Sequence, residues 1–294
     1  MKELALGIDV GSTNIKTGLV LKNKVKEFKT LPSNQEKILE ELVDIIKSYN
    51  SFHFSVIGVG FPGFIEDGKV YNVTSLSSIY GFELQEYLRK KTKFPVYVFN
   101  DANAYIFGEV LAGNGKNAKI VVGLTLGTGV GGAIVIDKKV YKGTQGFASE
   151  FGHMIIDLEG PECRCGNKGC LEAFVGGYAI SNRYKVLSGK EKSVKEIFDE
   201  ARKRKTIALK VVNDFGFYLG VGINNIVKAL DPDLVIIGGG IAKAGNMILK
   251  LIKKNQSLES LSFKKVKIKI AKLQDKAGII GSANWALLKH KTSE

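Results

Sequence analysis

Residues 4–16 of the chain read LALGIDVGSTNIK and set the expected fold class. The apolar run Leu4 to Ile8 predicts a strand, Gly11 allows a tight turn, and residues 17–21 predict a second strand. A similar stretch recurs at residues 119–136, where the turn reads LGTGVGG. Helical and strand patterns follow each stretch, so the order of antiparallel strands, helix, strand and helix occurs twice. The sequence therefore predicts an α/β protein of two similar domains, with a cleft between them that suits a small ligand.

Apolar periodicity extends this pattern along the chain. A helix is expected from about Ser33, because Ser33 and Glu36 have the spacing of a capping box. A hairpin is expected around Asp137 and Lys138, and a helix directly after the glycine run 238–240. The remaining helices are expected at residues 84–91, 102–111, 171–187, 194–203, 207–230 and 276–289, and buried strands at 55–60, 95–99, 234–238 and 266–271.

The composition is that of a globular protein. The chain has 294 residues, of which 45% are hydrophobic and 24% charged, and this is too apolar for disorder and long enough for two domains with their own cores. No apolar run approaches the roughly 18 residues that span a membrane. The N-terminus begins with a strand-like segment and not with a signal peptide. We expect a soluble cytoplasmic protein, and not a transmembrane, secreted or fibrous one.

The net charge is +14, because 43 Lys and Arg residues outnumber 29 Asp and Glu residues. The placement of the lysines matters more than their number. Lys265, Lys267 and Lys269 alternate with apolar residues, which is the period of a strand with one face in water. Other lysines are scattered along predicted helices, without an Arg-rich block or interleaved aromatic residues. The pattern favours solvated faces over a nucleic-acid surface.

All three cysteines of the chain fall within eight residues, at Cys163, Cys165 and Cys170. An odd number in a cytoplasmic protein argues against a disulfide framework. Three thiolates are one ligand short of a tetrahedral zinc site, and His153 lies ten residues upstream. The pattern predicts a structural Cys₃His zinc site, and the alternative is a loop of three buried thiols.

Three glycine-rich loops have the character of phosphate sites. In the first, Gly11 permits a close approach of the backbone, Asp9 can orient a magnesium ion, and further donors or positive charge come from Ser12, Thr13, Asn14 and Lys16. The second comprises Gly127, Thr128 and Gly129, and the third Gly238, Gly239 and Gly240. Each loop alone has an ordinary alternative as a packing turn. Three such loops at strand ends predict a nucleotide site, although no Gly-Lys-Ser or Gly-Lys-Thr sequence of a Walker A loop occurs.

With these motifs in this order, the chain resembles the ROK family of sugar kinases and repressors over nearly its whole length. The most specific part is Glu150-Phe151-Gly152-His153 followed by Cys163-x-Cys165-Gly166-x-x-Gly169-Cys170-x-Glu172. The resemblance implies an actin-like fold of two ribonuclease-H-like domains. Residues 1–112 with the C-terminal helix 276–294 would form the smaller domain, and residues 113–275 the larger domain with the zinc loop. It also implies ATP with Mg²⁺ in the cleft and a homo-oligomer, either a dimer or a tetramer.

The resemblance further implies roles for individual residues. Asp101 would be the general base for the primary hydroxyl of a sugar, and Asn100 would bind a neighbouring hydroxyl. Glu150, His153 and Glu172 would bind ring hydroxyls, while His153 would also ligate zinc. Pro62 and Gly63 match a turn whose backbone lies close to the sugar. The match weakens at Ser75, where many members carry asparagine, and this residue bears on which sugar is used.

The implied activity is ATP-dependent phosphorylation of the 6-hydroxyl of a hexose, with glucose first. Mannose, fructose, N-acetylglucosamine and N-acetylmannosamine remain as alternatives. A sugar-responsive repressor of the same family is a second hypothesis, but only eight residues precede Asp9, too few for a helix-turn-helix domain. An actin-like assembly protein is a third, and it gives no reason for the Glu-His-cysteine-Glu constellation.

Overall fold

The computed structural model describes residues 3–71, 79–254 and 266–293. Within it, the chain forms two compact units. The first unit contains residues 1–117, 138–148 and 272–294, and the second contains residues 118–137 and 149–271. These units differ from the predicted domains at residues 113–117, 138–148 and 272–275, which belong to the first unit.

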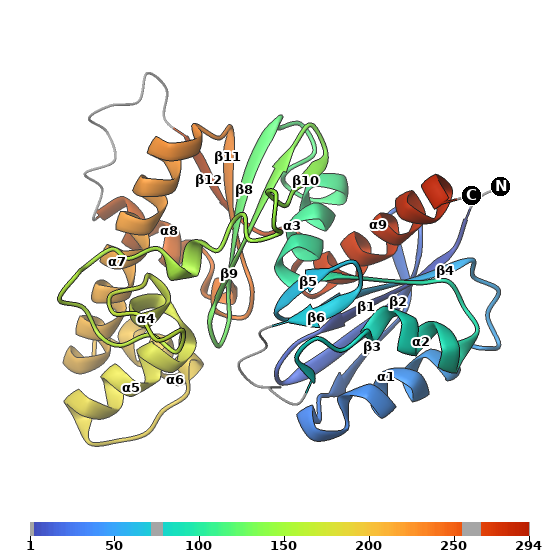
Figure 1. The fold of residues 1–294 in the computed structure, drawn as a ribbon. Helices are drawn as coiled ribbons and strands as arrows, with labels where there is room; N and C mark the ends of the chain where they lie inside the picture. The colour runs from blue at the N-terminus through green and yellow to red at the C-terminus, as the bar shows by residue number, and fades with distance from the viewer. Residues whose placement is uncertain (1–2, 72–78, 255–265, 294) are drawn as a thin grey trace. The chain divides into compact units, whose positions relative to one another are not determined.

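The sheet of the first unit has the strand order β3-β2-β1-β4-β7 (Figure 1). Strands β2 and β3 are antiparallel to their neighbours, whereas β1, β4 and β7 are parallel to one another. Strands β5 and β6 form a separate two-stranded ribbon. The bounds are β1 Ala5–Val10, β2 Asn14–Leu21, β3 Lys24–Pro32, β4 Val56–Phe61, β5 Phe64–Glu66, β6 Lys69–Tyr71 and β7 Val96–Asn100.

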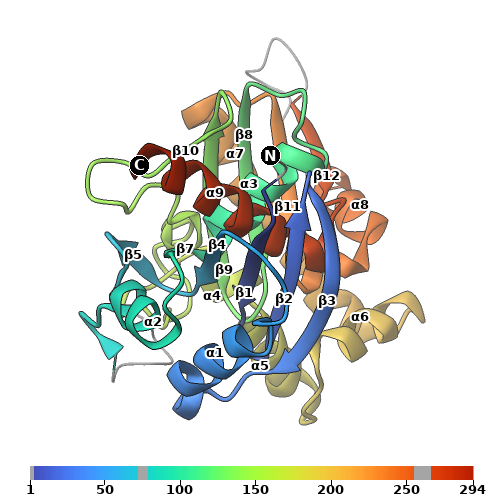
Figure 2. The same ribbon diagram turned by 90° about the vertical axis from the view of Figure 1, so that its right-hand side faces the viewer.

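Helices cover both faces of this sheet (Figure 2). In β1, Leu6 and Ile8 pack in one core with residues of α1 and α2, while Gly7 faces the opposite way and meets α9. A Cβ on Gly58 of β4 would lie 2.0 Å from the carbonyl oxygen of Ser282, so glycine lets α9 lie directly on the strands. The helices are η1 Gln35–Lys37, α1 Ile38–Lys47, α2 Leu84–Thr92, α3 Asp101–Ala112, η5 Gln274–Lys276 and α9 Ala277–Ser293.

The second unit repeats the same arrangement. The second five-stranded sheet has the order β10-β9-β8-β11-β12, with β8 antiparallel to β9 and parallel to β11, and all its strands except β10 belong to the second unit. The strands are β8 Ile120–Leu126, β9 Val130–Ile136, β10 Lys139–Tyr141, β11 Leu234–Gly238 and β12 Lys267–Ile270. The helices are η3 Phe151–His153, α4 Glu172–Val175, α5 Gly177–Ser188, α6 Val194–Arg202, α7 Thr206–Leu230, η4 Ile241–Ala244 and α8 Asn246–Lys254. The repeated order confirms the predicted α/β class of two similar halves.

Helix α7 is long and apolar enough, by length and composition alone, to cross a membrane. A core helix of a soluble protein passes the same test, and half of this stretch is buried inside the protein. Its inward side chains, among them Val212, Phe215 and Leu219, belong to the core of the second unit. The packing therefore accounts for the apolar composition of α7.

Three local predictions were wrong. The predicted helix 171–187 is divided into α4 and α5, because Gly176 adopts an extended conformation with ψ 150°. Ser33 does not cap α1; the Asn34 side chain instead accepts a hydrogen bond from the Glu36 N–H (3.0 Å) and caps η1. After Gly240 the chain forms the short η4, and a full helix begins only at Asn246.

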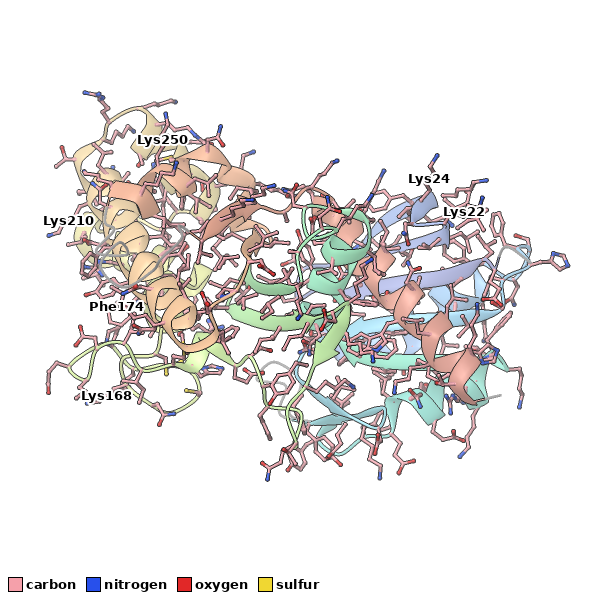
Figure 3. All side chains as sticks on the ribbon, turned by 90° about the horizontal axis from the view of Figure 1, so that it is seen from above. Lys22, Lys24, Lys168, Phe174, Lys210 and Lys250 are labelled. Carbon is pink, nitrogen blue, oxygen red and sulfur yellow. The ribbon has the colours of Figure 1, made fainter. Side chains whose placement is uncertain are left out.

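Two of the three lysines predicted on the exposed face of a strand lie as expected, and Lys265 lies outside the described residues. Lys267 and Lys269 on β12 are exposed, while Ile268 and Ile270 pack against the core. In Figure 3, Lys22 before β3, Lys24 at the start of β3 and Lys250 on α8 point away from the ribbon. These positions fit solvated faces.

Candidate functional site

The turn between β1 and β2 forms the first glycine loop. The Gly11 N–H donates to the Asn14 carbonyl oxygen (2.9 Å), which closes the turn. The turn is also held from outside, because the Ser33 N–H donates to the Thr13 carbonyl (3.0 Å) and Gln35 Nε2 donates to the Ser12 carbonyl (3.3 Å). The loop therefore has a fixed backbone, as a preformed anion site requires.

Charged groups gather at this loop. Asp9 lies near the end of β1, and burial raises its pKa to about 6 although Lys16 opposes the shift. Lys16 forms an ion pair with Asp275 (3.0 Å), a residue just before α9. A Cβ at Gly278 would lie 2.4 Å from the Asp9 carboxyl carbon, so α9 needs glycine there. Sequence reasoning missed Asp275 and Gly278, because only the return of the C-terminal segment to β1 brings them here.

Asn100 and Asp101 stand where β7 passes into α3. Asn100 caps the helix, because its Oδ1 accepts from the Asn103 N–H (2.9 Å), and its Nδ2 donates to the Gly63 carbonyl (2.9 Å). Asp101 is the first helical residue, and its Oδ1 accepts from the Ala102 N–H (2.8 Å). The cap is thus Asn100, which also draws the Pro62-Gly63 turn against the start of α3. The structure brings these four predicted residues together within the first unit.

The turn between β8 and β9 is the second glycine loop. The Gly127 N–H donates to the Gly129 carbonyl (3.0 Å), and this bond closes the turn. The start of α5 holds this loop, because the Gly177 N–H donates to the Gly127 carbonyl (2.9 Å) and the Tyr178 N–H to the Thr128 carbonyl (3.3 Å). These bonds account for the break of the predicted helix 171–187 at the Gly176-Gly177 pair.

Glu172, the first residue of α4, supports the same loop. This buried carboxylate accepts from the Val130 N–H through Oε2 (2.8 Å). A Cβ at Gly129 would lie 2.3 Å from that oxygen, whereas a Cβ at Gly127 would meet nothing within 4 Å. Glu172 therefore ties the loop to α4, two residues beyond Cys170.

The third glycine loop lies beside the second. Gly239 has φ +85°, and a Cβ there would lie 2.4 Å from the Leu126 carbonyl oxygen. Gly238 pairs with Thr125 in the β8–β11 ladder. The sequence predicted both loops for a nucleotide, and the sheet places them side by side in the second unit.

The three cysteines and His153 form one cluster. Their ligand atoms all lie within 4.8 Å of one another. Cys163 Sγ lies 3.7 Å from His153 Nδ1, and Cys165 Sγ lies 3.7 Å from Cys170 Sγ. Burial raises the pKa of Cys170 to about 12, so a thiolate there requires a nearby cation. The donor set and its convergence fit a tetrahedral metal ion such as Zn²⁺.

Glu150 connects this cluster to the remaining predicted residues. Its Oε2 lies 3.9 Å from His153 Nε2, so the imidazole has Nδ1 toward the sulfurs and Nε2 toward the carboxylate. Burial raises the pKa of Glu150, and the positive charge of a protonated His153 would oppose the shift. Glu150 thus lies beside the cluster of His153 and the cysteines, and Glu172 follows two residues after Cys170 in the second unit. Ser75 lies outside the described residues.

The chain is similar to known proteins over nearly its whole length. The ROK family profile matches residues 5–289. A glucokinase of Halalkalibacterium halodurans is 34% identical, with 98% of this chain and 96% of that protein covered. A xylose repressor of Bacillus spizizenii is 32% identical over 86% of this chain and 68% of its own length.

A solved structure shows the same fold. The ROK family glucokinase of Streptomyces griseus, in complex with glucose and AMPPNP, matches with a TM-score of 0.88 at 26% identity, covering 97% of this chain and 99% of that one. The fold is the two-domain actin-like fold of sugar kinases. The chain belongs to the ROK family.

Proposed function

We propose that this protein is an ATP-dependent hexose kinase that phosphorylates the 6-hydroxyl of glucose. The observation that carries the proposal is the position of Asp101, a carboxylate at the start of α3 beside the Asn100–Gly63 bond. Support comes from glucokinases among the relatives and from the solved relative that contains glucose and AMPPNP. Phosphorylation of mannose, fructose, N-acetylglucosamine or N-acetylmannosamine remains the alternative within the same mechanism.

In this mechanism Asp101 accepts the proton of the sugar 6-hydroxyl as its oxygen attacks the γ-phosphorus of ATP. The bond between the β,γ-bridging oxygen and phosphorus breaks, and ADP leaves with that oxygen. Asn100 holds the Pro62-Gly63 turn and binds a neighbouring hydroxyl. Glu150, His153 and Glu172 bind ring hydroxyls, because carboxylates accept hydrogen bonds and imidazole can donate or accept.

The phosphates of ATP are assigned to the loops at Gly11–Lys16 and Gly127–Gly129, and the adenosine to Gly238–Gly240. Lys16 supplies positive charge at the first loop. Asp9 would hold the Mg²⁺ that accompanies ATP, directly or through water, and that ion would neutralise charge on the phosphates. A cytoplasmic location, where ATP is abundant, and a homo-oligomer belong to the same proposal.

The four-residue cluster is proposed to hold a structural zinc ion through His153, Cys163, Cys165 and Cys170. A closed four-ligand site supplies folding energy and no open position for catalysis. With Nδ1 of His153 toward the sulfurs, Nε2 is left facing Glu150, so the imidazole keeps one orientation toward the sugar.

A coupled assay of ADP release tests the proposal. The purified protein is given Mg²⁺ and ATP with each of the five sugars in turn, beside a reaction without sugar. Turnover that depends on glucose supports the proposal, and preference for another sugar moves the specificity without changing the mechanism. Binding of sugar without turnover on any of them would overturn it and favour a sugar-responsive regulator, a class that the xylose repressor relative represents.

A further inference from the structure

Glu109 is a buried carboxylate that the proposed mechanism does not use. It lies in the last turn of α3, and its side chain is 0% exposed. Among the described residues Glu109 forms no ion pair, and its oxygens accept hydrogen bonds from backbone N–H groups. Burial of a carboxyl group is costly unless its oxygens are hydrogen-bonded. An apolar residue at this position would leave those N–H groups without their acceptor.

The two oxygens of Glu109 bind two segments that are far apart in sequence. Oε2 accepts from the Asn114 N–H (2.9 Å), and Oε1 accepts from the Leu273 N–H. Gly113 is required between them, because a Cβ there would lie 2.0 Å from Oε2. The backbone carbonyl of Glu109 also accepts from Gly113 and Gly115 (2.9 and 3.0 Å). Glu109 therefore binds both segments, one through its side chain and its backbone carbonyl and the other through its side chain.

These segments adjoin the first and the last of the four points at which the chain passes between the units. The chain first leaves the first unit after residue 117, returns to it for residues 138–148, and enters it for the last time at residue 272. Asn114 thus precedes the outgoing crossover by three residues, and Leu273 is the second residue after the return. A movement of the second unit that pulls on these two connections therefore also pulls on the Asn114 and Leu273 N–H groups, which are bonded to Glu109.

Glu109 also lies on the same rigid helix as Asp101. The two residues are eight positions apart in α3, which corresponds to about 12 Å along a helix. On the return side, Leu273 is followed by Asp275, the ion-pair partner of Lys16, and by Gly278, which contacts Asp9. The carboxylate therefore joins the helix of the proposed base to the segment that borders the first glycine loop.

We propose that Glu109 is a positioning residue: it binds the segments at the first and last crossovers to the end of α3 and so sets the geometry between Asp101 and the phosphate-loop segment. This inference rests on the proposed kinase function. A misplacement of reacting groups by about 1 Å can lower a rate by 10²-fold. A small displacement of the two segments bonded to Glu109 is therefore expected to have a large kinetic effect.

The test is Glu109→Gln, with Glu200→Gln as the matched control. The glutamine amide keeps one acceptor oxygen, but its NH₂ group faces the second backbone N–H. One of the two hydrogen bonds is therefore lost. Glu200 is also a buried helical glutamate, bonded to Tyr184 and to Lys205 (2.6 Å each), and it lies in the second unit away from the crossovers. Both variants are assayed below the temperature at which circular dichroism shows unfolding.

We expect Glu109→Gln to lower kcat for sugar phosphorylation at least tenfold, with less than a threefold change in the KM for glucose. The fraction of ATP hydrolysed without sugar phosphorylation should rise. Glu200→Gln should keep kcat within twofold, even where it lowers the melting temperature as much. A folded Glu109→Gln protein with kcat and coupling within twofold of wild type overturns the proposal.

Hydrogen exchange separates this inference from the proposed function. Glucose and AMPPNP are added to wild type and to Glu109→Gln, and exchange is followed in residues 113–117 and 272–276. Ligand should change exchange in both segments together in wild type and separately in the variant, whether or not glucose is phosphorylated. If ligand changes hydrogen exchange in only one of the two segments of the wild-type protein, the proposed role of Glu109 is overturned. If Glu109→Gln does not fold, Leu273→Pro removes the donor instead, since the φ of −79° at Leu273 suits proline.

Discussion

The two glycine loops at β1–β2 and β8–β9 occupy the same place in two sheets of the same strand order. Each is closed by a glycine N–H, from Gly11 to Asn14 and from Gly127 to Gly129. Each also has carbonyl groups held by a later segment, by Ser33 in the first unit and by Gly177 in the second. The two loops therefore have a similar pattern of backbone hydrogen bonds, although different elements supply the bonding groups.

The charges around the two loops differ. The first has Asp9, Lys16 and Asp275 around it, and the second is supported by Glu172 through the Val130 N–H. The comparison teaches that topology fixes the shape of a loop, while side chains from other elements decide its chemistry. It leads to the hypothesis that the first unit supplies reacting groups and the second unit supplies groups that hold the ligands.

The largest effect is expected at the reacting group of the first unit. Asp101→Asn keeps the helix start but removes the base, so kcat should fall about 10²–10⁴-fold while glucose binding changes little. Calorimetric binding and the coupled assay measure the two quantities separately. Asp231→Asn is the control, because Asp231 ends α7 in a left-handed conformation that asparagine also tolerates. Full activity in Asp101→Asn would remove Asp101 from the base role.

The metal cluster is expected to give the next largest effect, and it acts on the second unit. Cys165→Ala removes one of four ligands at an exposed position, so little packing is lost with the sulfur. Zinc content, thermal stability and glucose affinity should fall together, because the ion orients His153 and fixes the loop before Glu172. Metal analysis checks the first quantity, and a wild-type protein without zinc would refute the assignment.

Gly129→Ala tests the support of the second loop. Its Cβ would lie 2.3 Å from the Glu172 carboxylate, so the Glu172–Val130 bond must shift and the free energy of unfolding should fall by about 1–3 kcal/mol. Gly127→Ala is the matched control for stability, because a Cβ there meets nothing within 4 Å. Chemical denaturation measures both variants. Equal stability of the two would show that Glu172 does not constrain this loop.

The smallest effect concerns pH and the first loop. The Asp9 pKa is about 6 in the folded protein and near 3.8 when exposed, so the folded state binds the proton more tightly. Stability without Mg²⁺ and nucleotide should therefore fall as pH rises from about 4 to about 6, and the loss is complete above that range. The amplitude is about 1–2 kcal/mol, below the full linkage value because the side chain is partly exposed.

Asp9→Asn should remove this pH dependence and stabilise the protein at pH 7. Thermal unfolding from pH 4 to pH 8 measures the difference from wild type. Lys16→Met should extend the dependence to higher pH, because the Lys16 charge lowers the Asp9 pKa. An unchanged profile in Asp9→Asn would assign the dependence to other groups.

The sequence predicted the main strands of the two large sheets and the grouping of the three cysteines with His153, because these depend on local periodicity and close spacing. It also predicted the glycine loops, since clustered glycines at the end of an apolar run indicate a tight turn. It predicted neither the β5–β6 ribbon nor the break at Gly176, which arises from hydrogen bonds to residues about 50 positions earlier. Asp275, Gly278 and Glu109 were missed for the same reason, because their roles depend on the path of the chain between its two units. Ser33 and Asn34 are adjacent capping residues, and local pattern does not choose between them.

The close fit of α9 on Gly7 and Gly58 has a consequence for biosynthesis. The sheet of the first unit is built mainly from residues 5–100, but the helix that covers one of its faces comes from residues 277–293. During synthesis, helix α3 is available to this face early, but the part that α9 covers is left without its helix until most of the second unit has been made. We expect the N-terminal strands to need protection by chaperones during translation, and the final helix to act as the last step that commits the chain to its native state.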